Sequence, residues 1–157
     1  MTPYKHTQIG YLMLVVLLAV LGLFVRVYIS ALAEPPSVNS GPNFAMTVMM
    51  VSVLFFIAQF AILTISIDEN SLRIKFGCGI FSKKFALDQI ASVKSVKNRW
   101  YYGWGIRLWL WPKMWIYNVS GFDAVEITLK NGKVYRIGTD VSKELEVAVK
   151  RLANFSQ

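Results

Sequence analysis

The residues best suited to recognising another molecule are concentrated in one aromatic and basic stretch, residues 97–118, KNRWYYGWGIRLWLWPKMWIYN. It holds all five tryptophans of the chain, three tyrosines and four basic residues. Indole and phenol rings suit the boundary between water and lipid, where basic side chains can bind lipid phosphates. The residues selected as a possible contact surface for lipid or a protein partner are Arg99, Trp100, Trp104, Arg107, Trp109, Trp111, Lys113 and Trp115.

These aromatic residues have a second interpretation, in which they fill the interior of a small domain that needs large apolar side chains. Arg107, Trp109 and Trp111 alternate, so an extended backbone would place all three on one side. The guanidinium could then stack on the indoles or bind a phosphate. Alternatively, Arg107 forms a stabilising ion pair with one of three acidic residues, Asp123, Glu126 or Asp140.

Catalytic chemistry has little support in the sequence. The single cysteine, Cys78, excludes an intramolecular disulfide and a cysteine metal cluster, and we interpret it as an inert thiol. The single histidine, His6, precedes the first apolar segment, so no histidine-based catalytic set can form within the basic half. Ser120 lacks the flanking residues of a nucleophile elbow. We therefore predict a protein that is not an enzyme, with no cofactor and no metal.

Composition divides the chain into two parts. The chain is 55% hydrophobic and yet has a net charge of +8. Residues 1–65 carry a net charge of +1, so the remaining 92 residues carry +7. This contrast predicts an N-terminal membrane anchor in residues 1–65 and a basic domain in residues 62–157. Nucleic-acid binding is conceivable from the charge alone, but a basic domain beside a membrane explains it more simply.

Two apolar segments, residues 9–25 and 44–63, carry no charge and predict a transmembrane hairpin with helices at about residues 9–32 and 43–63. Residues 34–43 between them contain three prolines and one glycine, which end both helices. A cleaved signal peptide is the competing interpretation of the first segment, and the second segment argues against it. We expect Gln59, the most polar residue of the second segment, to bond a neighbouring helix. The connecting loop has no Lys or Arg beyond Arg26 at its edge, so both termini and the basic domain are predicted to be cytoplasmic.

The basic half has the alternation of β-strands. Residues 62–67 and 72–76 predict a hairpin, followed by strands at 80–87 and 90–96. In the hairpin around Asn131-Gly132, the apolar residues on both sides are odd-numbered, which predicts a three-residue loop with a left-handed Gly132. Thr139-Asp140 predicts an N-cap, and apolar residues from 141 to 155 fall on one helical face. About seven antiparallel strands with one closing helix predict an α+β fold: a β-sandwich or partly open barrel, capped by this helix.

Several strings within residues 60–155 are familiar together: SLRIKFGCGIF at 71–81, GWGIR at 103–107, YNVSG at 117–121, AVEITLKNGK at 124–133 and RIGTD at 136–140. With the two preceding spans, the chain resembles the bacterial pleckstrin-homology-like (PH-like) family of small membrane proteins. The resemblance implies a seven-stranded bent sandwich with a C-terminal helix and no catalytic activity. It does not supply ligand residues. The first hairpin loop reads DENS and is acidic, which argues against phosphoinositide recognition by that loop.

The function expected from these observations is that of a membrane-anchored adaptor or scaffold in the plasma membrane. Its partners would be the bilayer, anionic lipid headgroups or a membrane protein. The alternative is an accessory or regulatory subunit of a larger membrane complex.

Overall fold

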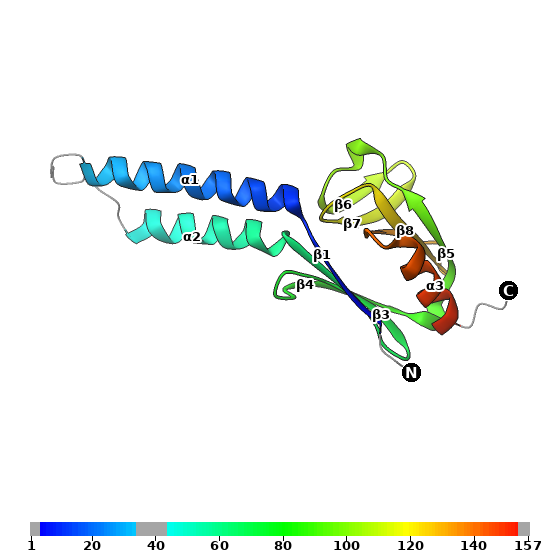
Figure 1. Cartoon of the computed structure of the whole chain (residues 1–157). Coiled ribbons are helices and arrows are strands. Elements are labelled where there is room, and N and C mark those ends of the chain that lie inside the picture. The colour runs from blue at the N-terminus through cyan, green and yellow to red at the C-terminus, as the bar shows by residue number, and fades with distance from the viewer. Residues whose placement is uncertain (1–3, 34–43, 154–157) are drawn as a thin grey trace.

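The computed structural model describes residues 4–33 and 44–153 of the chain. The described residues have an α+β architecture: two apolar helices lie side by side and extend away from a head, which consists of two β-sheets and a C-terminal helix (Figure 1). At each junction between the helices and the head, the chain changes from helix to strand within three residues.

The two helices form because both segments are long apolar runs without proline. α1 spans Tyr11–Ala33 and α2 spans Phe44–Gln59. No side chain of α1 is buried, and only Met50 and Gln59 are buried in α2. Apolar helices with so few buried side chains are typical of lipid surroundings and unusual in water.

Among the described helices, α1 alone is long and apolar enough to cross a membrane. α2 has 16 residues and so a length of about 24 Å, against about 30 Å of hydrocarbon in a bilayer. The predicted second transmembrane span at 43–63, and with it the transmembrane hairpin, is therefore not confirmed. Its last residues leave the helix because the chain turns at Phe60 and Ala61 and enters a strand at Ile62.

The first sheet has four antiparallel strands in the order β1-β2-β3-β4. They are β1 (Tyr4–Ile9), β2 (Ile62–Ile67), β3 (Ser71–Phe76) and β4 (Phe81–Ala86). Alternating apolar side chains correctly predicted β2 and β3, and the strand predicted at 80–87 is confirmed as β4. β1 was not predicted, because its sequence YKHTQI shows no apolar alternation.

β1 makes the anchor and the head one continuous structure. It pairs along its whole length with β2, from Tyr4 opposite Ile67 to Ile9 opposite Ile62. The strand before α1 and the strand after α2 are thus neighbours, and the helix pair extends from a two-stranded ribbon (Figure 1).

The second sheet has five strands in the order β5-β8-β9-β7-β6. They are β5 (Ile90–Lys97), β6 (Gly105–Leu110), β7 (Lys113–Asn118), β8 (Asp123–Leu129) and β9 (Val134–Gly138). The prediction of about seven antiparallel strands is wrong in two respects. The described residues contain nine strands, and β7 and β9 are parallel, because β9 inserts between β8 and β7.

The hairpin of β8 and β9 has the predicted loop. Val125 lies opposite Ile137 and Ile127 opposite Tyr135, so odd positions face odd positions. The Leu129 N–H donates to Lys133 O at 2.9 Å, which closes a loop of residues 130–132, and Gly132 has φ +79°. The three-residue loop with a left-handed glycine is confirmed.

α3 (Ser142–Leu152) packs on β5 and β8, with Leu145 and Val149 fully buried. The predicted N-cap is wrong by one residue: Val141 occupies that position and no side chain caps the helix. Asp140 instead forms an ion pair with His6. Phe155, predicted on the apolar face of this helix, lies outside the described residues. Two short 3-10 helices, η1 (Leu87–Gln89) and η2 (Trp100–Tyr102), complete the head.

The main core lies between the two sheets and under α3. Side chains from the first sheet meet those of the second, as in the edge-to-face pair of Phe85 and Tyr135 with ring centroids 4.8 Å apart. The largest fully buried side chains include Leu63, Ile65, Ile67, Leu72, Ile74, Phe76, Ile127, Ile137 and Leu145.

Candidate lipid-binding and partner-binding surface

The aromatic stretch serves both of the roles that the sequence left open. Tyr102, Met114 and Ile116 are buried and form a second, smaller core, against which Trp109 packs. The Trp109 ring lies 5.0 Å from that of Tyr102, and its Nε1 donates to Trp111 O at 2.8 Å. Trp109 is therefore a structural residue of the head. Its neighbours in the sequence are largely exposed.

The exposed members lie on η2 and around the hairpin of β6 and β7. Trp111 is 90% exposed, Trp100 78% and Leu110 73%. Leu108 pairs with Trp115, and both face the same side of the sheet as the buried Tyr117 and Tyr135. Leu108 and Trp115 nevertheless stay about two-fifths exposed. Large apolar side chains exposed together in this way mark interaction surfaces.

Arg99 and Lys113 are the exposed basic residues at the ends of this surface. The Arg99 Nη1 donates to the Tyr101 hydroxyl at 2.7 Å, and its guanidinium carbon lies 5.8 Å from the Tyr101 ring centre. The hydrogen bond from the guanidinium to Tyr101 raises the pKa of Arg99 above its ordinary value. The exposed charge of Arg99 therefore lies beside the ring of Tyr101.

Arg107 forms neither the ion pair nor the indole stack that were predicted for it, and its binding of a phosphate stays a prediction. Among the described residues it has no ion pair, because Glu126 binds Lys94 and Arg136 and Asp140 binds His6. Nor does its guanidinium stack on an indole: its Nε donates to Trp104 O at 3.3 Å.

The glycine at position 103 leaves room for the Arg107 side chain to fold back in this way. Gly103 has φ +67°, and a Cβ there would lie 3.0 Å from the guanidinium carbon of Arg107. Gly105 has φ +94°. Trp111 lies beyond the end of β6, so only Trp109 shares a strand face with Arg107. The result is an exposed guanidinium, without a carboxylate partner in the described structure, held close to Trp104.

Trp104 belongs to a groove between the helices and the head, which we call the junction groove. Its volume is about 360 Å³. The Trp104 Nε1 is buried and has no acceptor among the described residues. The residues that line the groove come from the start of α1, the end of α2 and the start of β6: Met13, Val16, Phe56, Ile57, Phe60, Trp104, Gly105 and Ile106.

Polar contacts on both sides of the helix ends fix the head to the helices. The Gln59 Oε1 accepts from the backbone N–H and the Sγ of Cys78, each at 3.1 Å. The prediction that Gln59 bonds a neighbouring helix is therefore wrong: it binds the turn between β3 and β4. Cys78 itself is exposed.

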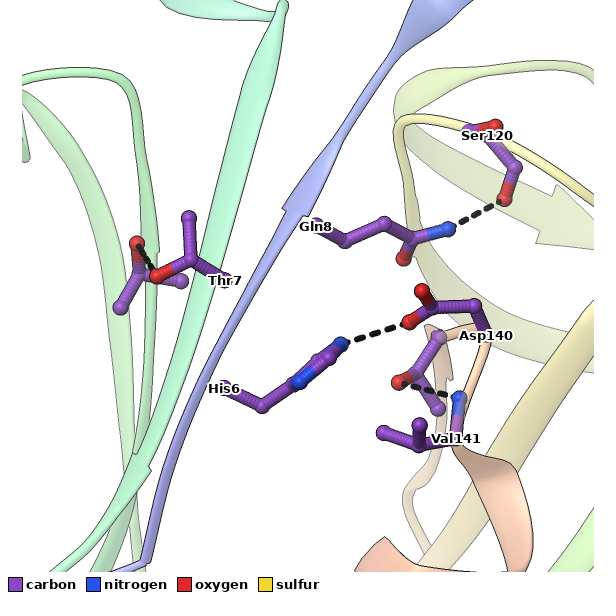
Figure 2. Close-up of polar contacts among 8 residues, drawn as sticks. His6, Thr7, Gln8, Ser120, Asp140 and Val141 are labelled. Atoms are coloured by element: carbon purple, nitrogen blue, oxygen red, sulfur yellow. Dashed lines mark hydrogen bonds and ion pairs between the residues drawn. The ribbon is translucent and has the colours of Figure 1, made fainter.

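Figure 2 shows how β1 reaches the second sheet: His6 and Gln8 point to one side of the strand and Thr7 to the other. His6 Nε2 and Asp140 Oδ1 are 2.6 Å apart, and Gln8 Nε2 donates to Ser120 O at 3.1 Å. Thr7 meets Thr64 on β2. Sequence analysis missed these contacts; the only signal was the run of polar residues before an apolar helix.

The outer face of the second sheet carries a charge cluster. Glu126 Oε2 accepts from Arg136 Nε at 2.8 Å, and its Oε1 lies 3.0 Å from Lys94 Nζ. Burial is the largest single influence on the pKa of Glu126 and would raise it, but the hydrogen bonds and charges of Lys94 and Arg136 together hold it below 4.5. The Arg136 guanidinium also lies 5.4 Å from the ring centre of Tyr102. This cluster stabilises the sheet.

The described residues contain no group of three His, Cys, Asp or Glu side chains able to hold a metal ion. No known protein family matches the chain, and no curated protein matches it significantly. The resemblance to bacterial PH-like proteins rests on short strings and stays a prediction.

Proposed function

We propose that this protein is a non-enzymatic adaptor or scaffold, in which a helical hairpin anchors a PH-like head at the cytoplasmic face of the plasma membrane. The head would contact anionic lipid or a protein partner through its exposed aromatic and basic side chains. One observation carries this proposal: two exposed apolar helices continue directly into paired strands of a head that presents Trp100, Leu110 and Trp111 to its surroundings.

The pairing of β1 with β2 also bears on the anchor. Cleavage of α1 as a signal peptide would remove β1, which pairs along its whole length with β2 and contacts Ser120 and Asp140. An uncleaved α1 keeps this sheet complete. The return of the chain to the same head after α2 supports two membrane crossings, with local thinning of the bilayer or flanking residues compensating for the short α2.

The native cysteine provides a test of this topology. Cys78 is exposed at the turn between β3 and β4. With the full chain in cells, we expect a membrane-impermeant maleimide to leave Cys78 unmodified until the membrane is permeabilised. This expectation is supported by the positive-inside rule, because the head carries a charge of +7 beyond residue 65.

The matched control moves the thiol to the connecting segment. A Cys78→Ser, Ser37→Cys double variant should react in intact cells. Labelling of Cys78 from outside would contradict the cytoplasmic head, and equal accessibility of both positions from inside would contradict the hairpin.

A second candidate is an accessory subunit of a larger membrane complex. A shallow apolar groove of about 200 Å³ lies between α1 and α2, with Phe24, Tyr28, Met50 and Leu54 among its lining residues. Such grooves between helices can accept a side chain of another span. Gentle extraction and a native mass measurement separate the two candidates: a strict monomer argues against the subunit.

A further inference from the structure

The junction groove lies at the level where the helices leave the head. Met13 and Val16 belong to the first two turns of α1, Phe56 and Ile57 to the last turn of α2, and Phe60 follows directly. If α1 spans the bilayer as proposed above, its 23 residues extend about 34 Å, slightly more than the hydrocarbon thickness. The first turns of α1 then lie at the boundary between acyl chains and headgroups, so the groove opens at that depth.

The walls of the groove suit an acyl chain. The side chains of Met13, Val16, Phe56, Ile57 and Phe60 are apolar, and Ile106 continues this surface onto the head. The same apolar helix faces continue along α1 and α2 without a charged residue before Arg26. Lipid beside the helices therefore has an uninterrupted apolar path into the groove.

A positive charge lies next to one wall. Arg107 Nε donates to the backbone oxygen of Trp104, which lines the groove. Its side chain is exposed, and within the described residues it has no carboxylate partner. A guanidinium donates in a fork that matches phosphate, and it is weakly hydrated, which suits the headgroup region.

We propose that the junction groove binds an anionic phospholipid of the bilayer, with an acyl chain against Phe56, Phe60 and Trp104 and the headgroup phosphate at Arg107. This inference rests on the proposed membrane anchoring and names the ligand and the residues that bind it. It places lipid recognition at the start of β6, away from the acidic loop between β2 and β3. Trp104 reports on the acyl chain and Arg107 sets the preference for negative charge.

The test uses the full chain in vesicles of phosphatidylcholine with a minor fraction of phosphatidylglycerol, in which either lipid carries brominated acyl chains. Bromine quenches an indole that it touches. We expect brominated phosphatidylglycerol to quench more strongly than the same fraction of brominated phosphatidylcholine. Trp104→Phe should abolish most of this difference, and Trp109→Phe, at the tryptophan that packs against Tyr102 within the head, should leave it unchanged. Trp104→Phe is a mild change, because it removes an N–H that has no acceptor in the described structure.

The charge is tested by Arg107→Gln, with Arg107→Lys as the variant that keeps it. We expect the glutamine variant to lose about fivefold of the preference for the anionic lipid, which corresponds to about 1 kcal/mol for one basic residue at the surface. The lysine variant should retain most of it. Equal quenching by both lipids, or a preference that Arg107→Gln leaves intact, would overturn the proposed site.

Flotation of the same vesicles distinguishes a failure of the membrane anchor from a failure of the lipid site. A protein that does not float with vesicles of either composition would contradict the membrane anchor itself. A protein that floats fully and yet shows no Trp104-dependent quenching would contradict only the lipid site. Quenching of Trp104 by both lipids alike would show a groove filled by bulk lipid without selection for charge, and would also count against the proposal.

Discussion

We expect replacement of Gly10 by valine to lower the free energy of unfolding by about 2–3 kcal/mol or more. Gly10 is buried between β1 and α1, and its N–H donates to Ala61 O at 2.7 Å. A Cβ on Gly10 would lie 2.7 Å from Val119 O and 3.3 Å from Ala61 O. Both oxygens belong to backbone, so the clash is relieved only by moving β1 away from the second sheet.

The comparison is Gly22→Ala, in the middle of α1. A Cβ at Gly22 meets no atom within 4 Å, and alanine favours a helix by about 1 kcal/mol over glycine. We expect this variant to unfold at the wild-type temperature or slightly above it. Thermal unfolding in detergent, followed by the fluorescence of the tryptophans in the head, measures both variants. A Gly10→Val protein as stable as wild type would show that β1 is not held close to the second sheet.

The sequence predicted those parts of the fold in which a side-chain pattern repeats. Strands β2 and β3 alternate apolar and polar residues. In the hairpin of β8 and β9, the odd-numbered positions of the apolar residues, such as Val125 and Ile137, determined even the length of the loop. α1 followed from its uninterrupted apolar run. In each case local periodicity and burial favour the same structure, so no information about distant residues is needed.

The errors arose where distant residues decide the structure. β1 has a polar sequence and becomes a strand because β2 offers it a free edge. The order of the second sheet depends on the insertion of β9 between β8 and β7, which no local pattern encodes. Gln59 was expected within the membrane, but the turn at Cys78 supplies its donors.

The sequence predicted which stretch of the chain carries the candidate surface, but not how the side chains of that stretch are arranged. Composition alone selected the stretch that carries Trp104 and Arg107. It did not distinguish the core residue Trp109 from the exposed Trp111, because both are tryptophans near one strand and only packing against Tyr102 separates them. Nor did composition indicate that Trp104 lines a groove together with residues of both helices, because this groove is formed by three segments far apart in the chain.

We expect Glu126→Gln to lower the free energy of unfolding by about 1–3 kcal/mol at about pH 7, between the values for exposed and buried ion pairs. The Glu126 and Arg136 side chains are 12% and 16% exposed, so the variant leaves a half-buried guanidinium without its counter-charge. Lys94 is 64% exposed and can return to water at little cost. The loss should therefore come mainly from Arg136.

The pH dependence of this difference tests its cause. The folded-state pKa of Glu126 is depressed below 4.5, so its contribution is fully present above the unfolded-state pKa and is lost as the pH falls through the folded-state pKa. The melting temperatures of wild type and variant should differ most from about pH 5 upwards and should converge as the pH falls through the folded-state pKa of Glu126. Glu146→Gln is the matched control, because Lys150, its partner, is 48% exposed and glutamine can still accept from the Ser95 N–H. If the difference in melting temperature between wild type and Glu126→Gln persists unchanged in acid, packing and not the charge accounts for the lost stability.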